Sequence, residues 1–342
     1  MAVIRVGVVG YGYWGPNLVR NFLANRQFEV VAVSDTRPVA REAAARSYPM
    51  VRIFEHATDL LARADIDAVA IATPVASHFP LARDALLRGK HVLVEKPLCA
   101  SSAEGEELIA LAERVGRVLM VDHTFLFTGA VQAIRRTVDS GDLGKLCYFD
   151  SMRVNLGLFQ ADVNCLWDLA PHDLSIIDHI LRDEVVAIDV AGYCHVNPTL
   201  PDMVYLTLHY ARDAVAHLNL SWMSPVKVRR FAIGGTRRML IWDDLDQDQK
   251  IRIYSSGIEF HSEKERPTII PDYRIGDIYS PRIPRFEALS AVIDHFANVI
   301  RGSEPSIMDG THGLRVVRTL ERAQHLLERN LQDIARRRTS AL

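Results

Sequence analysis

The sequence contains little cysteine, almost no net charge and no long apolar run, and each shortage excludes a class of protein. Its four cysteines in 342 residues form no C-x-x-C pair, so neither a zinc ribbon nor a disulfide scaffold is predicted. A formal net charge of -2 leaves no overall electrostatic footprint for nucleic acid or an anionic membrane. The apolar stretches all break well before the roughly 20 residues that would cross a bilayer. The cysteines are Cys99, Cys147, Cys165 and Cys194.

Targeting signals are also missing from the N-terminus, where Met1 leads directly into the strand-like segment 2–9. We find no basic n-region, cleavage site or twin arginine, so we expect no secretion and a location in the reducing cytoplasm. The one local basic run is Arg336–Arg338, which follows a helical pattern where cations suit the helix dipole. We interpret it as a solvated helix end, and expect neither nucleic acid nor membrane as a partner.

What is present is the composition of a folded enzyme, with 49% hydrophobic and 24% charged residues, and a length that favours two domains. In residues 1–125, short apolar runs alternate with helix-like stretches rich in alanine and leucine. This rhythm predicts βαβ units and a doubly wound parallel sheet of the Rossmann type, covered by helices on both faces. The expected strands are 3–9, 29–35, 68–73, 91–96 and 118–123.

Residues 126–342 are predicted to form a second α/β domain for substrate binding and oligomerisation, with C-terminal helices that pack back on the first domain. A helix is expected near 130–140, and seven alternating segments between 148 and 256 predict a large open, mainly antiparallel sheet with one uncovered apolar face. Pro171 indicates a helix start near His172. We expect a loop over 261–284 and two closing amphipathic helices near 285–300 and 312–336.

The motif G-Y-G-Y-W-G directly follows the first strand, with glycines at Gly10, Gly12 and Gly15. A bound pyrophosphate needs a tight turn, an approachable backbone and the free N–H groups of a helix N-terminus, and this arrangement supplies all three. The alternative, a glycine-rich turn without a ligand, is weak because strand, turn, helix and a following acid occur together. That acid is Asp35, 20 residues after the last glycine.

Asp35 predicts NAD as the cofactor, because a carboxylate accepts hydrogen bonds from the ribose hydroxyls and repels a 2′-phosphate. Arg37 lies two residues further on and is able to neutralise such a phosphate. NADP therefore stays open as the alternative cofactor, and a solvated loop residue as the alternative interpretation of Arg37.

Three further residues, Glu95, Lys96 and Pro97, end an apolar strand at the carboxyl edge of the sheet, where doubly wound folds bind ligands. A lysine that leaves an apolar strand end is partly desolvated, which suits it to proton exchange with an alcohol. For a lysine at any other position, a solvated surface residue would be the default interpretation. Pro97 forces a turn there, in either the cis or the trans form.

Asp168 and His172 are four residues apart, so an early helix start places both on one face. An imidazole is the natural proton acceptor near neutral pH, and a neighbouring carboxylate orients it. Helix capping by Asp168 with a packed histidine is the alternative interpretation. A metal site is a third, but no other spaced cluster supports it, and we expect no metal.

Four motifs together resemble the family of glucose-fructose oxidoreductase, inositol dehydrogenase and rhizopine-catabolism proteins, over nearly the whole chain. They are V-V-G-Y-G-Y-W-G, the strand end A-T-P-V-A-S-H, the signature H-V-L-V-E-K-P, and W-D-L-A-P-H-D. The resemblance implies that Lys96, Asp168 and His172 surround the reacting carbon. It also implies an open sheet that packs between subunits of a dimer or tetramer.

Contacts with the ligands are also assigned by resemblance and pattern. The segment V-D-H-T-F-L-F, with Asp122, His123 and Phe125, departs from the asparagine and arginine that many members carry near the substrate. Expected cofactor contacts are Gly10, Tyr11, Gly12, Tyr13, Trp14, Gly15, Asp35, Thr36, Arg37, Thr73, Pro74, His78, Glu95 and Lys96. Expected substrate contacts are His123, Arg153, Asn155 and Trp167.

The resulting hypothesis is an NAD(P)-dependent oxidoreductase that moves a hydride between nicotinamide and a hydroxyl- or keto-bearing carbon of a sugar. Resemblance favours a sugar nucleotide or amino-sugar precursor with 3-keto chemistry. The alternatives are a non-catalytic NAD(P)-sensing regulator of the same fold, a dehydrogenase of inositol or another polyol, and a reductase of another small carbonyl compound. Retention of Lys96, Asp168 and His172 argues against the regulator.

Overall fold

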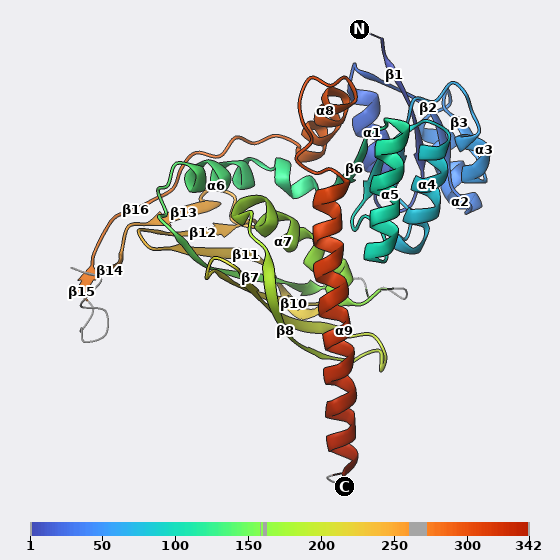
Figure 1. The fold of residues 1–342 in the computed structure, drawn as a ribbon. Helices are drawn as coiled ribbons and strands as arrows, with labels where there is room; N and C mark the ends of the chain where they lie inside the picture. The colour runs from blue at the N-terminus through green and yellow to red at the C-terminus, as the bar shows by residue number, and fades with distance from the viewer. Residues whose placement is uncertain (1, 158, 160–162, 260–271, 341–342) are drawn as a thin grey trace. The chain divides into compact units, whose positions relative to one another are not determined.

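The computed structural model describes residues 2–157, 159, 163–259 and 272–340. The chain divides into two compact units, Met1–Phe127 with Glu287–Glu321 and Thr128–Phe286 with Arg322–Leu342. The long helix α9 (Gly310–Ser340) contributes residues to both units (Figure 1). In the part of the chain described here, no helix has the length and apolar character that crossing a membrane requires.

The first unit is built on a six-stranded parallel sheet, which confirms the predicted Rossmann fold. The strand order β3-β2-β1-β4-β5-β6 reverses direction between β1 and β4, and ligands of such sheets bind outside the carboxyl ends at that point. The strands are β1 (Ile4–Val9), β2 (Phe28–Ser34), β3 (Arg52–Phe54), β4 (Ala68–Ile71), β5 (His91–Glu95) and β6 (Leu119–Asp122). The helical segments are α1 (Gly15–Ala24), α2 (Pro38–Ser47), α3 (Ala57–Leu61), η1 (Val75–Ser77), α4 (His78–Leu87), α5 (Ser102–Val115), η2 (Thr124–Phe127) and α8 (Ala288–Ile300).

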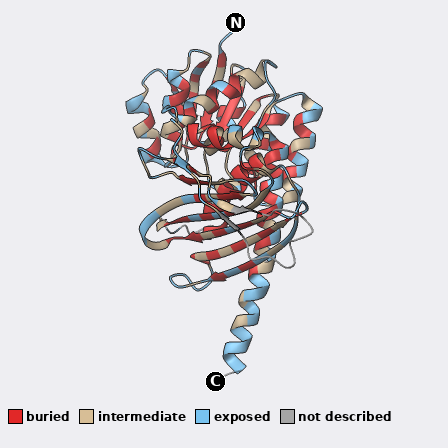
Figure 2. Cartoon of the chain, turned by 90° about the vertical axis from the view of Figure 1, so that its left-hand side faces the viewer, coloured by how far each residue is buried: buried red, intermediate tan, exposed pale blue. Residues whose placement is uncertain are grey.

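Burial explains why these apolar runs become central strands. Every residue of β4 and β6 is buried, and Figure 2 shows the strand cores in red, as expected when helices cover both faces of a sheet. The late helix α8 joins this unit through an aromatic stack of Phe28 on Phe296, with ring centroids 6.0 Å apart. An ion pair between Arg20 and Glu287 ties α1 to the residue that precedes α8.

The second unit contains an eight-stranded sheet with the order β16-β13-β12-β11-β7-β10-β9-β8. Six of its seven strand pairs are antiparallel, but β7 and β10 run parallel, which alternation in the sequence did not predict. The helix α7 (Cys165–Leu181) follows β7, and a crossover of this length is what a parallel pair needs. The strands are β7 (Leu146–Leu156), β8 (Val185–Tyr193), β9 (Met203–Tyr210), β10 (Val215–Ser221), β11 (Met223–Gly235), β12 (Met239–Asp243), β13 (Ile251–Tyr254) and β16 (Ile278–Tyr279).

Two expectations for the second unit are wrong in their bounds. Helix α7 begins at Cys165 and not near His172, because the Asn164 side chain caps it by accepting a hydrogen bond from the Trp167 amide at 3.2 Å. Pro171 therefore lies inside the helix. The expected loop over 261–284 contains β15 (Asp272–Arg274), which pairs with β14 (Gly257–Glu259), and β16; residues 260–271 lie outside the described residues. The predicted helices appear as α6 (Gly129–Asp139), α8 and α9.

The two faces of the large sheet differ. Helix α7 packs on β7, β9 and β10, and side chains such as Phe149, Leu206 and Leu218 are buried on that face. The opposite face carries a mixture of apolar and polar residues, so it is less apolar than expected. The row that crosses it contains Asp189, Thr207, His217, Asp150, Ala232, Ile241 and Arg252.

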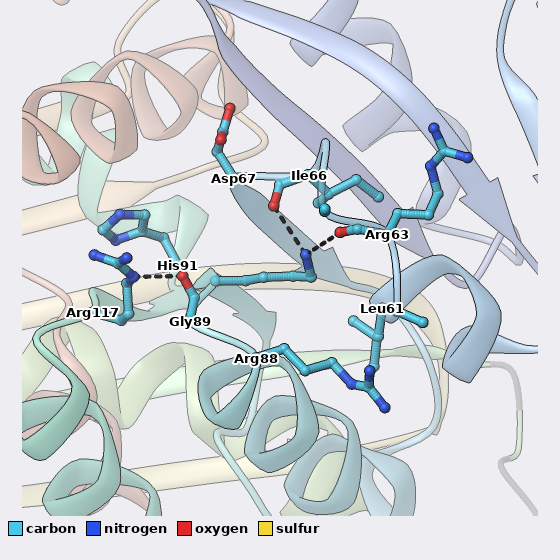
Figure 3. A pocket seen from close by; sticks show the side chains of 11 residues that line it. Leu61, Arg63, Ile66, Asp67, Arg88, Gly89, His91 and Arg117 are labelled. Carbon is cyan, nitrogen blue, oxygen red and sulfur yellow. Dashed lines mark hydrogen bonds between the residues drawn. The ribbon is translucent and has the colours of Figure 1, made fainter.

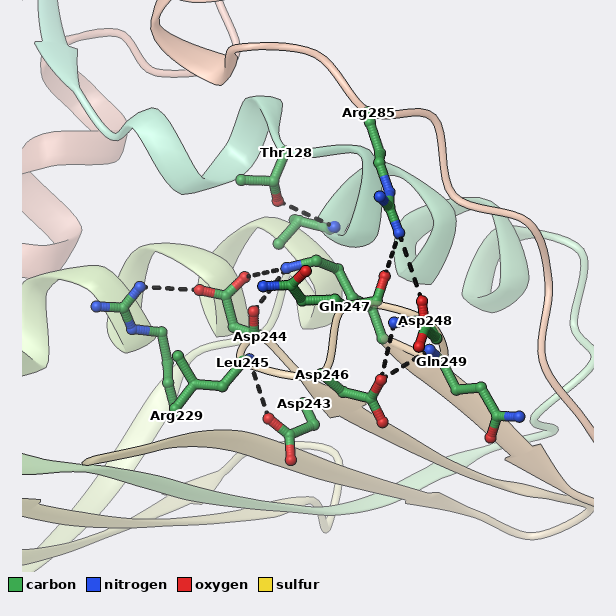
Figure 4. A network of polar contacts seen from close by, with 12 residues as sticks. Thr128, Arg229, Asp243, Asp244, Leu245, Asp246, Gln247, Asp248, Gln249 and Arg285 are labelled. Carbon is green, nitrogen blue, oxygen red and sulfur yellow. Dashed lines mark hydrogen bonds and ion pairs between the residues drawn. The ribbon is translucent and has the colours of Figure 1, made fainter. Parts of the chain in front are cut away.

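An acidic turn joins β12 to β13 and is held by its own polar contacts (Figure 4). The Asp244 carboxylate accepts a hydrogen bond from Arg229 at 2.8 Å and one from Lys250 at 3.3 Å. Burial acts to raise the pKa of Asp244, but these two cations outweigh it and lower the pKa. Asp246 accepts the amides of Asp248 at 2.9 Å and Gln249 at 2.8 Å, which closes the turn. The carboxylates therefore stabilise a hairpin.

Candidate active site

The loop after β1 has the close backbone packing that the three glycines predict. Gly10 has a φ of 95°, and a Cβ there would lie 2.3 Å from the carbonyl oxygen of Ala72. A Cβ at Gly15 would lie 2.2 Å from the Gly10 carbonyl. At Gly12 the nearest atom would be the end of the Arg37 side chain at 3.3 Å, so this part of the backbone is approachable. Helix α1 begins here without a side-chain cap, which leaves its N-terminal amides for an anion.

Asp35 follows β2 and faces this loop. Its carboxylate accepts hydrogen bonds from the Tyr11 amide at 2.8 Å and the Arg37 amide at 2.8 Å. The Arg37 guanidinium adds two more bonds, from Nε at 3.0 Å and Nη2 at 2.9 Å. Burial acts to raise the pKa of Asp35, but these hydrogen bonds outweigh it and lower the pKa. The carboxylate is 7% exposed and stays ionised as an acceptor.

Arg37 is therefore more than a solvated loop residue. Its side chain is 61% exposed but lies against Asp35 as a bidentate partner. Arg41 supports the same turn by donating to the carbonyl oxygens of Asp35 at 3.0 Å and Thr36 at 2.8 Å. The pairing gives the loop two features with opposite preferences, a carboxylate that favours a free ribose and a guanidinium that favours a 2′-phosphate.

His78 connects the loops that follow β4 and β5. Its Nδ1 lies 2.8 Å from the Pro97 carbonyl oxygen and its Nε2 lies 2.8 Å from the Thr73 carbonyl oxygen. The ring is 1% exposed, and burial lowers its pKa despite these carbonyls. A neutral ring donates to only one of these two carbonyls and lies against the other, so His78 packs between Thr73 and the turn at Lys96 and Pro97, whose peptide bond is cis.

Two carboxyl groups lie beside Lys96, and no pattern in the sequence predicts that they pair. Glu95 and Asp122 occupy partner positions at the ends of β5 and β6. Burial, and then the Asp122 carboxylate, raise the pKa of Glu95 well above its usual range. Burial also raises the pKa of Asp122, although Thr124 donates to it at 2.6 Å and Trp14 at 3.5 Å. The pair therefore holds a proton more tightly than an isolated carboxyl group does.

His123 is placed in the interior of the first unit. It is 1% exposed, and its ring lies 5.2 Å from the ring of His312. Neither ring nitrogen has a hydrogen-bond partner among the described residues. Burial, then His312 and Lys96, lower the pKa of His123 well below its usual range. The His123 ring is thus a buried polar group without a hydrogen bond among the described residues. The motif V-D-H alone could not reveal this.

In the second unit, the helix α7 carries the predicted acid and base. Between Cys165 and Ile177, only Trp167, Asp168 and His172 are partly exposed, and every other residue is buried. The three residues singled out from the sequence are therefore those that this stretch of helix presents to its surroundings. The Trp222 indole N–H donates to Asp168 at 3.1 Å and orients that carboxylate.

Arg153 and Asn155 lie on β7, next to this helix. Arg153 is 4% exposed, and its Nε donates to the carboxylate of Asp173 at 2.7 Å. Ser151 donates to the other oxygen of Asp173 at 2.6 Å, so the fully buried Asp173 is shared by two partners. Asn155 is half-buried. Sequence reasoning missed Asp173, although its position directly after His172 was the available signal.

The site residues thus form two groups, each on its own unit. The first unit holds the glycine loop, Asp35 and Lys96, and the second holds Asp168 and His172. Among the residues that the structure describes, no group of three or more histidine, cysteine or acidic side chains has the arrangement of a metal site.

Comparison with known proteins places both units in one family. A family model described as "Oxidoreductase family, NAD-binding Rossmann fold" matches residues 4–123, and its companion for the C-terminal domain matches residues 131–241. A UDP-N-acetylglucosamine 3-dehydrogenase from Acidithiobacillus ferrooxidans is 28% identical over 338 residues, which cover 97% of this chain and 100% of the relative. Its solved structure has a TM-score of 0.81, with 26% identity over 96% of this chain and 99% of that one.

A second relative is similar over a shorter stretch. The 1-carboxy-3-chloro-3,4-dihydroxycyclo hexa-1,5-diene dehydrogenase of Comamonas testosteroni is 30% identical over 200 residues. That match covers 56% of this chain and 50% of the relative, so the chain spans about half the length of this protein. The names of the two relatives give different substrates, but both name a dehydrogenase.

Proposed function

Because the chain belongs to the oxidoreductase family with an NAD-binding Rossmann fold, we propose that it oxidises or reduces a sugar carbon by hydride exchange with NAD. The observation that carries this proposal is the selective exposure of Trp167, Asp168 and His172 in the otherwise buried stretch 165–177 of α7, in a chain that also has the glycine loop and Lys96. A regulator of the same fold has no need for these side chains.

The residues have separate tasks in the proposed reaction. The glycine loop and Asp35 would hold NAD+, which would supply the acceptor for the hydride from the C–H bond of a secondary alcohol. Lys96 or His172 takes the hydroxyl proton as the carbonyl forms, and returns it in the reverse direction. Asp168, held by the Trp222 indole N–H, orients His172 and stabilises its charged form. Glu95 and Asp122 together hold a proton beside Lys96, which limits the negative charge that this lysine meets.

For the substrate, we propose a sugar nucleotide or amino-sugar precursor oxidised at carbon 3. The support is the relative that acts on UDP-N-acetylglucosamine, because the match covers both chains almost completely. The test is reduction of NAD+, followed by nicotinamide absorbance, with UDP-N-acetylglucosamine, free N-acetylglucosamine and inositol in parallel. Turnover with the sugar nucleotide alone supports the proposal. Turnover with inositol alone would contradict the substrate class but not the chemistry, and no turnover would contradict both.

Cofactor preference gives a first prediction. We expect NAD+ to bind more tightly than NADP+, and Asp35→Ala to weaken NAD+ binding by about tenfold or more, because it removes hydrogen bonds to a charged acceptor. Fluorescence titration measures both affinities. Asp35→Asn is the control, since it removes the charge but can still accept from the Tyr11 amide. Equal or tighter NADP+ binding by the unaltered protein would show that Arg37 dominates this site.

We also propose that the chain forms a homo-oligomer, a dimer or tetramer, through the uncovered face of the large sheet. Met152 is 40% exposed on that face, in a row with Tyr205 and Asn219. We expect light scattering to give at least twice the mass of one chain, and Met152→Glu to shift it toward a monomer. Met50→Glu is the matched control, because Met50 is 94% exposed on the first unit. A single-chain mass at micromolar concentration would contradict this assembly.

A further inference from the structure

A pocket of about 530 Å³ lies in the first unit, at the edge of the sheet opposite the glycine loop. It is formed where β4 and β5 begin, whereas Gly10, Asp35 and Lys96 follow the ends of their strands. Figure 3 shows the side chains that line it. The charged and imidazole side chains of the lining are Arg63, Asp67, Arg88, Lys90, His91 and Arg117.

Part of this charge is already neutralised. Two arginines of the lining form ion pairs with carboxylates outside it. Asp67, the carboxylate of the lining, forms an ion pair with an arginine outside it. These ion pairs leave no net charge for a ligand. They are Arg63 with Asp65, Arg88 with Asp84 at 2.8 Å, and Arg5 with Asp67 at 2.8 Å.

Lys90 and Arg117 are different, because the groups that accept their hydrogen bonds are neutral carbonyls. Lys90 is 3% exposed and donates to the carbonyl oxygens of Arg63 at 2.6 Å and Ile66 at 2.9 Å. Arg117 donates through Nε to the Gly89 carbonyl. Among the described residues, neither cation forms an ion pair with a carboxylate. Burial lowers the pKa of Lys90, although the nearby Asp67 carboxylate acts to raise it.

Helix ends alone do not account for these two cations. Helices α4 and α5 both end beside the pocket, and each C-terminus carries a partial charge of about -0.5. Two such ends offset about one positive charge, whereas Lys90 and Arg117 supply two. The positive charge that remains lies in a pocket where the buried Nε of Arg63 also has no hydrogen-bond partner among the described residues.

His91 adds a neutral donor to the same wall. Its Nδ1 accepts a hydrogen bond from the Val118 amide at 3.1 Å, so in the neutral ring the proton is on Nε2. Burial, and then Arg117, lower the pKa of His91 to about 4. The ring therefore remains uncharged at neutral pH and offers an N–H group.

We propose that this pocket is a second ligand site, which binds a compact polyanion carrying phosphate or carboxylate groups through Lys90 and Arg117. The ligand binds independently of the cofactor, because the two sites lie at opposite edges of the sheet. Arg63 and His91 provide further donors. The surplus charge draws the ligand in, and the pocket volume limits it to a small molecule.

The test is isothermal titration of the full chain with pyrophosphate and, separately, citrate, each at constant ionic strength. Saturating NAD+ is present throughout, because pyrophosphate also suits the glycine loop and must be excluded from it. Arg117→Gln should weaken binding about tenfold. Arg83→Gln is the matched control, since Arg83 is an exposed arginine of α4 paired with Glu107 outside this pocket.

The two ligands identify the anion chemistry, and three outcomes would overturn the proposal. Tighter binding of pyrophosphate indicates a phosphate ligand, and tighter binding of citrate indicates a polycarboxylate. Equal affinity in Arg117→Gln and the unaltered chain would overturn the site, as would an equal loss of affinity in the control Arg83→Gln. Absence of heat with both anions would also overturn it. Arg117→Lys keeps the positive charge at the same exposed position, so it should retain more of the affinity than Arg117→Gln.

Discussion

Lys96→Met is expected to lower kcat for hydride transfer by roughly 10² to 10⁴, the usual contribution of a general acid/base group. Cofactor affinity should change little, because the dinucleotide is held by the glycine loop and Asp35. Single-turnover measurements of nicotinamide absorbance give the rate, and a separate fluorescence titration gives the affinity. A lower rate with an unchanged cofactor affinity would identify Lys96 as a residue that acts on the substrate and not on cofactor binding.

Lys145→Met is the matched control, since Lys145 is an exposed lysine paired with Asp213 on the surface of the second unit. It should leave both quantities unchanged. His172→Ala should behave like Lys96→Met, and the double variant should lose less than the product of the single losses if the two residues share one proton. Near-normal transfer in Lys96→Met would assign Lys96 to the turn alone, and the regulator would gain support only if His172→Ala were silent too.

The sequence predicted the parts of this fold that depend on local pattern. Doubly buried strands need continuous apolar runs, so β1, β4 and β5 could be located directly. The glycine loop was also recognisable, because Gly10 and Gly15 occupy places where a Cβ would meet a backbone carbonyl. Spacing on a helix placed Asp168 and His172 on one partly exposed stripe.

The features that escaped prediction depend on residues far apart in the chain. The parallel pairing of β7 with β10 is set by how the strands after α7 return to the sheet, which no local alternation encodes. The start of α7 was misplaced because Pro171 is tolerated inside the helix, while the actual cap is Asn164. Glu95 and Asp122 meet only because β5 and β6 pair in register.

Arg153 illustrates how a long-range partner changes an interpretation. Its motif suggested a substrate contact, and the structure places its guanidinium against Asp173, with 4% of the residue exposed. A contact between Arg153 and substrate stays a prediction. The buried pair has a more direct consequence for stability, because it joins β7 to the helix that carries His172.

Asp173→Ala should destabilise the second unit by about 3–5 kcal/mol, since removing one partner of a buried ion pair leaves an uncompensated charge. Asp173 is fully buried and also accepts the Ser151 hydroxyl, so Arg153 would lose its carboxylate in a site without solvent. Urea unfolding, followed by a probe in the second unit, gives the free energy of unfolding. Asp139→Ala is the control, because the Asp139 side chain is 54% exposed and the loss of its ion pair with Arg135 should cost less than about 1 kcal/mol.

A double variant separates the two physical causes of such a loss. Arg153→Met with Asp173→Leu removes both charges and keeps apolar volume, so it should recover most of the stability that Asp173→Ala loses. Recovery would show that the cost arises from keeping the buried guanidinium without the Asp173 carboxylate. If the double variant were as unstable as Asp173→Ala, the attraction between the two residues, together with the Ser151 hydrogen bond, would itself stabilise the packing of α7 on β7. A loss below about 1 kcal/mol in Asp173→Ala would mean that water reaches Arg153 once the carboxylate is gone.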